Sequence, residues 1–225
     1  MYNIFDPAGQ QLSKGGGNIF SKFLDIKPEK QERIINAALK EFSQKGFEKA
    51  STNEIVKNAE ISKGLLFHYF HNKKELFLFL YDYSLDVVTK EFFEKVDFSE
   101  RDLFTRFRQM SLLKLELIKK YPEMLDFVLT AYLEESTEVK SELNANNMER
   151  LNSIYIRIFQ DIDTTRFKDG IDVKRAIQIF TWTMEGYSLQ KQKELKIRHY
   201  DEIDADEMFR EIDIYVDLLK GCFYK

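Results

Sequence analysis

The scarcity of helix-breaking residues constrains the fold of this chain more than any other feature. Its 225 residues include only 9 glycines and 3 prolines. A β-sandwich or β-barrel needs many turns, and turns depend on these two residue types. Apolar residues recur instead at helical spacing, as at Ile35, Leu39 and Phe42, and no strand-like alternation competes with this period. The sequence therefore predicts an all-α protein.

About nine helices are predicted from apolar periodicity and end signals. Pro28 suits the first position of the first helix, and Gly46 suits a left-handed stop. Ser51, Ser62, Asn72, Asp172 and Asp204 are the predicted N-caps. The expected ranges are 28–46, 51–59, 62–70, 72–96, 102–120, 122–133, 137–161, 172–198 and 204–221.

The charge is distributed unevenly along the chain. The net charge is −4, yet residues 27–74 carry ten Lys and Arg against six Asp and Glu. A basic N-terminal module on an acidic body favours an anionic partner for that module alone. Residues 1–27, which include Gly15–Gly17, are predicted to be a flexible arm. The lone Cys222 and the lack of any apolar run near ~20 residues predict a cytoplasmic protein without a membrane span.

The order of the first helices indicates a helix-turn-helix, in which two short helices follow a longer one. The stretch from Thr52 to Leu76, with Ile55, Ser62-Lys63-Gly64 and an aromatic run ending in Phe70, closely resembles the TetR/AcrR signature. The pattern around Phe42, Gly46 and Phe47 also fits that family. The resemblance implies an N-terminal three-helix DNA-binding domain (28–74) and a C-terminal helical bundle (75–225) for ligand binding and dimerisation.

The third helix is the expected recognition helix, whose N-terminal residues face base edges in the major groove. The candidate base contacts are Ser62, Lys63, Gly64 and Leu65. The resemblance assigns phosphate contacts to Thr52, His68, Tyr69 and Lys73. Solvated charge remains the alternative for the two lysines, and a core position the alternative for Tyr69. Glu60 and Phe67 depart from the family pattern, which has glycine and tyrosine there.

The C-terminal region is rich in aromatic residues, which can line an apolar ligand pocket or simply form core. The candidate pocket residues are Phe104, Phe107, Phe127, Tyr132, Tyr155, Phe159 and Trp182. The segment from Trp182 to Tyr187 is similar to the family's penultimate helix, which pairs with the last helix in a four-helix dimer interface. The candidate interface residues are Gly186, Met208, Ile212, Tyr215, Val216 and Leu219.

We therefore expect a homodimeric, sequence-specific transcriptional regulator that binds double-stranded operator DNA. The resemblance implies a repressor that is released from the operator by a small molecule, which we expect to be apolar or aromatic. The alternative is a helical small-molecule or protein-binding module with lost or altered DNA binding. No phosphate-binding loop, metal-ligand set or Ser/His/Asp set indicates an enzyme. His68 and His71 alone are too few to indicate a metal site, and no cofactor is expected.

Overall fold

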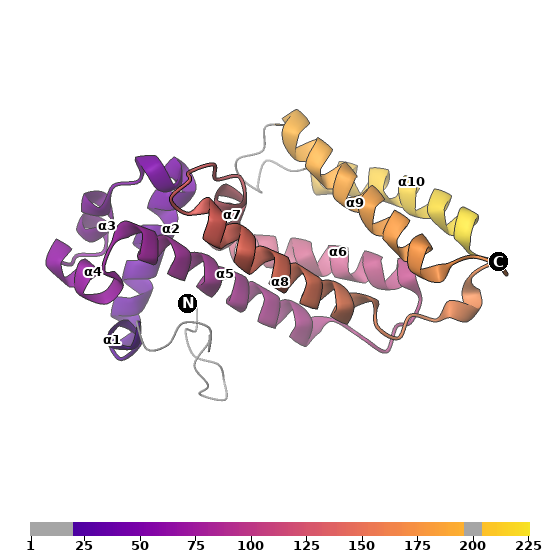
Figure 1. The fold of residues 1–225 in the computed structure, drawn as a ribbon, viewed down its shortest axis with the longest axis horizontal. Coiled ribbons are helices and arrows are strands. Elements are labelled where there is room, and N and C mark those ends of the chain that lie inside the picture. Colours follow the sequence, from indigo (N-terminus) through magenta and orange to yellow (C-terminus); the bar gives the residue numbers. More distant parts are fainter. Residues whose placement is uncertain (1–19, 196–203) are drawn as a thin grey trace. The chain divides into compact units, whose positions relative to one another are not determined.

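The computed structural model describes residues 20–195 and 204–225, and these residues are helical almost throughout (Figure 1). The predicted all-α class is confirmed, since the described residues contain only an isolated bridge between Phe167 and Tyr224 and no sheet. The helices are α1 Ser21–Leu24, α2 Pro28–Lys49, α3 Thr52–Asn58, α4 Lys63–Phe70, α5 Lys73–Lys95, α6 Leu103–Lys120, α7 Pro122–Tyr132, α8 Lys140–Phe159, η1 Thr164–Arg166, α9 Val173–Leu195 and α10 Ala205–Phe223. None of the described helices is long and apolar enough to cross a membrane.

Four of the five predicted helix caps are confirmed, because the backbone N–H of the third residue after each cap donates a hydrogen bond to the cap side chain. The acceptors are the side-chain oxygens of Ser62, Asn72, Asp172 and Asp204. Ser51 occupies the predicted N-cap position of α3, but its side chain accepts no capping bond. Its backbone N–H instead donates to the buried carboxylate of Glu41 at 2.8 Å, so a distant residue fixes the start of α3.

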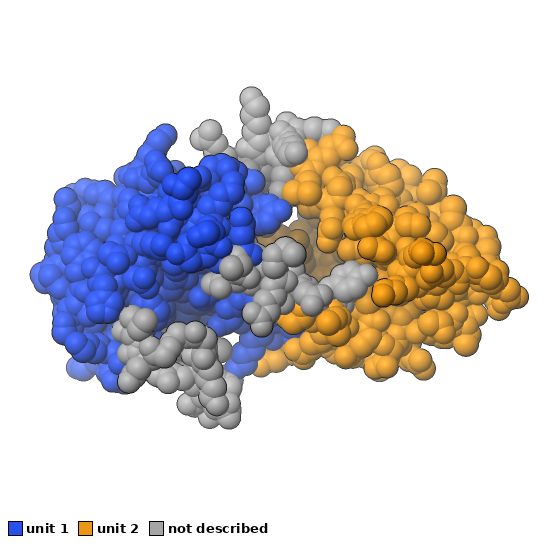
Figure 2. Space-filling view, in the orientation of Figure 1, with its two compact units in different colours: residues 1–93, 121–151 blue, residues 94–120, 152–225 orange. Residues whose placement is uncertain are grey.

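The chain divides into two compact units, coloured separately in Figure 2. The first contains residues 1–93 and 121–151, and the second contains residues 94–120 and 152–225. Helices α6 and α7 therefore belong to different units. This division differs from the predicted boundary at residue 74, because α7 packs along α2 in the first unit.

Two polar contacts hold α7 against α2 near the break at Gly46, whose φ of +68° only glycine adopts readily. The Phe47 N–H donates to the Glu134 carboxylate at 2.8 Å, and the Thr130 hydroxyl donates to the Ser43 carbonyl at 3.1 Å. The rings of Phe42 and Phe47 both pack on Phe77 of α5. The predicted end of the first regular helical segment at Gly46 is thus confirmed by its non-helical backbone.

The second unit has its own apolar core, formed by α6, α9, α10 and the segment around η1. Phe180 is fully buried there, and the ring of Phe104 lies edge-on to it at 5.4 Å. Arg106 is 2% exposed and donates to the carbonyls of residues 98, 100, 158 and 160, which ties the start of α6 to the end of α8. A buried guanidinium is tolerated because its donors are satisfied.

The prediction of a flexible arm over residues 1–27 is wrong for residues 20–27. These residues contain α1, and Phe23 within it is fully buried. Residues 1–19, including Gly15–Gly17, lie outside the described residues. The prediction failed at 20–27 because a single buried aromatic side chain in a four-residue helix leaves no periodic signal.

Candidate nucleic-acid interface

Helices α3 and α4 are joined by a tight turn whose geometry is set at Glu60. Ala59 ends α3, and the Ile61 N–H donates to the Val56 carbonyl at 3.0 Å. Glu60 has φ of +54°, a left-handed conformation that costs a residue with a side chain roughly 1–2 kcal/mol. The turn thus keeps the shape that glycine would adopt easily, at some cost in stability.

The inner faces of both short helices are apolar and buried. Ile55 and Ala59 of α3 and Leu66 and Phe70 of α4 have no exposed surface. These positions explain why residues 52–70 fold as two short helices despite their weak helical propensity. Their outer faces are left to the polar residues.

The N-terminal turn of α4 presents the predicted base-contact residues together. Ser62, Lys63 and Gly64 are exposed, and Leu65 is half-buried. A methyl group added at Gly64 would meet no atom of the described chain within 4 Å. The chain's own packing therefore does not require glycine there, which is the property expected of a residue that lets another surface approach closely.

The residues predicted to contact phosphate differ in their exposure to solvent. His68 is exposed and Thr52 is half-buried at the start of α3. Tyr69 is only 5% exposed, and its ring packs edge-on to Phe23 at 5.9 Å. Its placement favours the alternative that Tyr69 is a core residue, because an aromatic partner from α1 covers it.

Lys73 already has partners within the protein. Its ammonium donates to the carbonyls of Glu48 and Ala50 at 3.1 and 3.4 Å and lies 4.6 Å from the centre of the Phe47 ring. These contacts satisfy carbonyls at the end of α2. A structural role for Lys73 therefore competes with the predicted phosphate contact.

Two further charges near the interface are paired. Arg33 lies 3.4 Å from the Glu60 carboxylate. Lys74 donates to Glu142 at 2.6 Å, and this hydrogen bond raises the pKa of Lys74 and lowers the pKa of Glu142 to about 2. The exposed positive charge on α3 and α4 comes instead from Lys57 and Lys63, of which Lys57 was not among the predicted contacts.

The predicted pocket residues fall into separate environments. Phe127 is fully buried in the first unit, while Phe104, Phe107 and Phe159 belong to the apolar core of the second. Tyr132 and Trp182 are 54% and 61% exposed. The side chain of Tyr155 lies outside the described residues. The structure thus assigns the described buried members to core packing, so the pocket wall stays a prediction.

The predicted dimer-interface residues of α10 divide between two faces of the helix. Ile212, Val216 and Leu219 pack against the apolar core of their own unit, and Met208 is half-buried. The sequence did not separate these faces, because α10 carries apolar residues on both and periodicity alone cannot say which face turns inward. The outward face presents Ile214, Tyr215 and Leu218.

A matching apolar stripe lies on α9. Ile179, Trp182 and Leu189 are each at least 41% exposed. Gly186 falls on the same stripe by helical spacing, and a methyl group there would meet no atom of the described chain within 4 Å. Exposed apolar side chains on two neighbouring helices mark an interaction surface.

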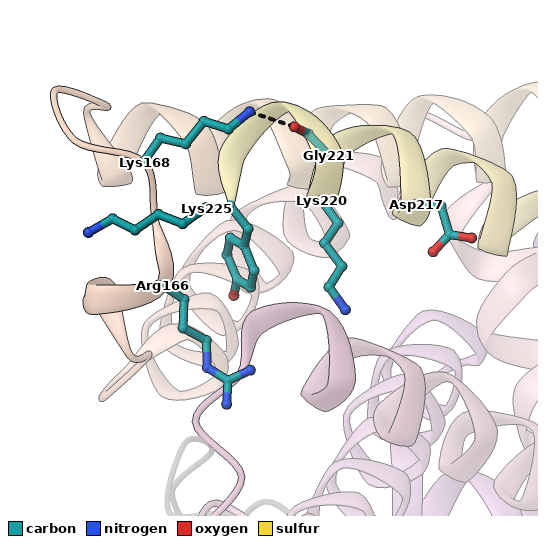
Figure 3. Close-up of a pocket in the computed structure, with 7 residues that line it drawn as sticks. Arg166, Lys168, Asp217, Lys220, Gly221 and Lys225 are labelled. Carbon is teal, nitrogen blue, oxygen red and sulfur yellow. Dashed lines mark hydrogen bonds between the residues drawn. The ribbon is translucent and has the colours of Figure 1, made fainter.

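A shallow pocket at the C-terminal end of the second unit is lined by cationic side chains (Figure 3). Lys168 donates to the Gly221 carbonyl at 2.7 Å, Arg166 pairs with Asp102, and Lys225 pairs with Asp169. Three of the lining cations thus already have partners within the described chain, at the end of α10, just before α6 and in the segment before α9. Among the described residues no group of three or more His, Cys, Asp or Glu side chains could hold a metal ion.

The two short helices α3 and α4, with the exposed first turn of α4, have the arrangement of a helix-turn-helix. Residues 34–80 match the family model described as bacterial regulatory proteins, tetR family. The helix-turn-helix region of this chain is therefore similar to that of the TetR family of bacterial regulatory proteins, and the predicted resemblance is confirmed over these residues.

Relatives and solved structures extend the match beyond the helix-turn-helix. The chain is 45% identical over 58 residues to the HTH-type regulator YuxN of Bacillus subtilis, covering 26% of this chain and 20% of YuxN. It is 22% identical over 166 residues to a fatty acid metabolism regulator protein of the same organism, and the match covers 71% of this chain and 81% of that protein. The structure of a TetR family regulator from Chloroflexus aurantiacus has a similar fold, with a TM-score of 0.57 and 18% sequence identity. The match covers 91% of this chain and 98% of that protein.

Proposed function

We propose that this protein is a sequence-specific DNA-binding repressor that acts as a homodimer. The observation that carries the proposal is the exposed first turn of α4, where Ser62, Lys63 and Gly64 stand on a helix-turn-helix with a fully buried inner face. Hydroxyl and ammonium groups can bind base edges, and glycine permits close approach. Repression is supported by the match of residues 34–80 to the TetR family and by relatives from Escherichia coli named as probable operon repressors.

Dimerisation is supported by the outward apolar faces of α9 and α10. A two-fold protein reads two half-sites of DNA, and a self-complementary surface of this kind fits a second copy of the chain. Its members are Ile179, Trp182, Gly186 and Leu189 of α9 with Ile214, Tyr215 and Leu218 of α10.

A small-molecule effector completes the proposal. Its binding would favour a spacing of the two recognition helices that does not fit the operator. Helix α5 and the α7 contacts with α2 are two routes by which the helix-turn-helix could be moved. We propose an apolar or aromatic effector, and the name of the fatty acid metabolism regulator favours an acyl chain. Native mass spectrometry of freshly purified protein would give both the oligomeric state and the mass of any retained ligand.

The decisive experiment is selection of binding sites from a randomised duplex DNA pool. We expect the protein to enrich a two-fold symmetric sequence and to bind it less tightly as salt rises, because phosphate contacts release counterions. Failure to enrich any sequence, by a protein shown to be folded and dimeric, would favour a binding module with lost DNA recognition.

A further inference from the structure

Helix α1, which precedes the helix-turn-helix, packs directly on its recognition helix. The Phe23 side chain is fully buried, with ring centres 4.7 Å from Phe70, 5.9 Å from Tyr69 and 5.4 Å from Phe79 of α5. Phe20 adds ring contacts to Phe70 at 5.8 Å and to Phe79 at 4.9 Å. The last turn of α4 is thus enclosed between α1 and α5.

A buried glutamine fixes this arrangement. Gln31 of α2 has no exposed surface, and its Nε2 lies 3.0, 2.7 and 3.1 Å from the carbonyl oxygens of Phe23, Leu24 and Ile26. These carbonyls lie at and just after the end of α1, where helical N–H donors run out, and the Phe23 carbonyl also accepts from the Ile26 N–H at 3.4 Å. The amide therefore specifies where α1 ends and holds it against α2.

The position of α4 depends strongly on such supports because the helix is short. It has eight residues, and its last turn is held by Tyr69 and Phe70 while its first turn presents Ser62, Lys63 and Gly64. A small tilt of a two-turn helix about its last turn moves its first turn away from the base edges. The side chains of a binding site must be held within about 0.5 Å of the positions that binding requires.

We propose that α1 is a positioning element for DNA recognition, in which Phe23 and Gln31 hold the recognition helix at the angle that base contact needs. This inference rests on the proposed DNA-binding function. It assigns Phe23 and Gln31 to specificity, although neither residue need touch DNA. Loss of the α1 contacts should therefore weaken binding to the selected site more than binding to random DNA.

The test compares variants of the full chain on two duplexes, the site selected by the wild-type protein and a scrambled duplex of equal length. Phe23→Ala removes the ring, and Phe23→Leu restores most of its apolar volume. Gln31→Glu keeps the side-chain shape but replaces the donor by a carboxylate that faces three carbonyl oxygens. Glu32→Gln, a half-buried neighbour, is the matched control for the amide–carboxylate exchange.

We expect Phe23→Ala and Gln31→Glu to lose about tenfold or more in affinity for the selected site, while binding to the scrambled duplex and its salt dependence change little. Phe23→Leu should recover most of the loss, and Glu32→Gln should bind like the wild type. Release of α1 is checked by trypsin cleavage after the exposed Lys22, since the Lys27–Pro28 bond resists trypsin.

Selected-site affinity within about twofold of the wild type, in a variant whose α1 is released, would overturn the proposal. An equal loss on both duplexes would also overturn it, because that result indicates general destabilisation. Circular dichroism well below the melting temperature verifies that each variant is folded. If Phe23→Ala does not fold, the same comparison is made with Gln31→Glu. Failure of the wild-type protein to select any site would instead refute the DNA-binding function itself.

Discussion

The recognition helix α4 and the paired helices α9 and α10 expose opposite kinds of surface. On α4 the apolar residues are buried and the exposed ones are small or polar, as at Ser62 and Gly64. On α9 and α10 large apolar side chains remain outside, with Trp182 61% and Leu218 62% exposed. The first surface suits a charged, hydrated partner such as DNA, and the second suits a dry contact with another copy. The two surfaces should thus respond differently to the same type of substitution.

The largest effect is expected from a charge placed in the proposed dimer surface. Leu218→Glu should barely change the stability of the isolated chain, because the side chain is already exposed. It should dissociate the dimer, since a carboxylate would be buried between copies. Loss of the second half-site should then weaken operator binding about 100-fold or more.

Sedimentation velocity and operator titration measure these two outcomes. Lys220→Glu, half a turn away on the same helix, is the control and should leave the dimer intact. A fully dimeric Leu218→Glu protein would exclude this face from the dimer contact.

A smaller effect is expected at Gly64 of α4, where stability and binding should move in opposite directions. Gly64→Ala should raise the free energy of unfolding by up to about 1 kcal/mol, because alanine favours helix and the added methyl meets no atom of the chain. The same methyl should weaken operator binding about tenfold if the backbone approaches DNA closely. Chemical denaturation and a binding titration check the two parts, and unchanged affinity would mean that α4 meets DNA through its side chains alone.

Lys63 and Lys73 provide a further contrast within the same interface. Lys63→Ala should lower the slope of binding affinity against salt by about 1, because its ammonium is exposed. Lys73→Met should cost stability, about 1 kcal/mol, because the Glu48 and Ala50 carbonyls lose a charged donor. Titrations across salt separate the two roles. A slope that also falls by about 1 for Lys73→Met would restore Lys73 as a phosphate contact.

The sequence predicted the features that local signals determine. Ser62 and Asp204 cap their helices as expected, because a cap acts within one turn of the chain. The sequence did not predict contacts between residues that are far apart along the chain, such as Glu41 with Ser51 and Glu134 with Phe47. Only the folded chain brings such groups together.

The sequence indicated the candidate DNA-binding surface more clearly than the proposed dimer surface. The exposure of Ser62, Lys63 and Gly64 follows from a motif within one helix. The sequence could not separate the two faces of α10, because Ile212 and Ile214 are equally apolar and only packing against α6 and α9 decides which of them faces solvent. Gln31 could have been found as a polar residue on the apolar stripe of α2.

The smallest effect is expected at Glu60, where one residue combines backbone strain with an unfavourable charge. Glu60→Gly should raise the free energy of unfolding by about 1 kcal/mol, because glycine adopts φ of +54° without a side-chain clash. It should also tighten DNA binding a few-fold, because a carboxylate near phosphate is removed and Arg33 loses its 3.4 Å ion pair.

Glu60→Gln separates these two contributions, since it removes the charge but keeps the strained conformation. It should tighten DNA binding like Glu60→Gly while leaving stability close to that of the wild type, because an ion pair whose side chains are 51% and 75% exposed contributes little. Thermal denaturation with binding titrations at two salt concentrations checks both. If Glu60→Gln lost stability and bound DNA no better, the Arg33–Glu60 pair would have to hold the turn in place, and the interface would depend on that pair as much as on the recognition helix.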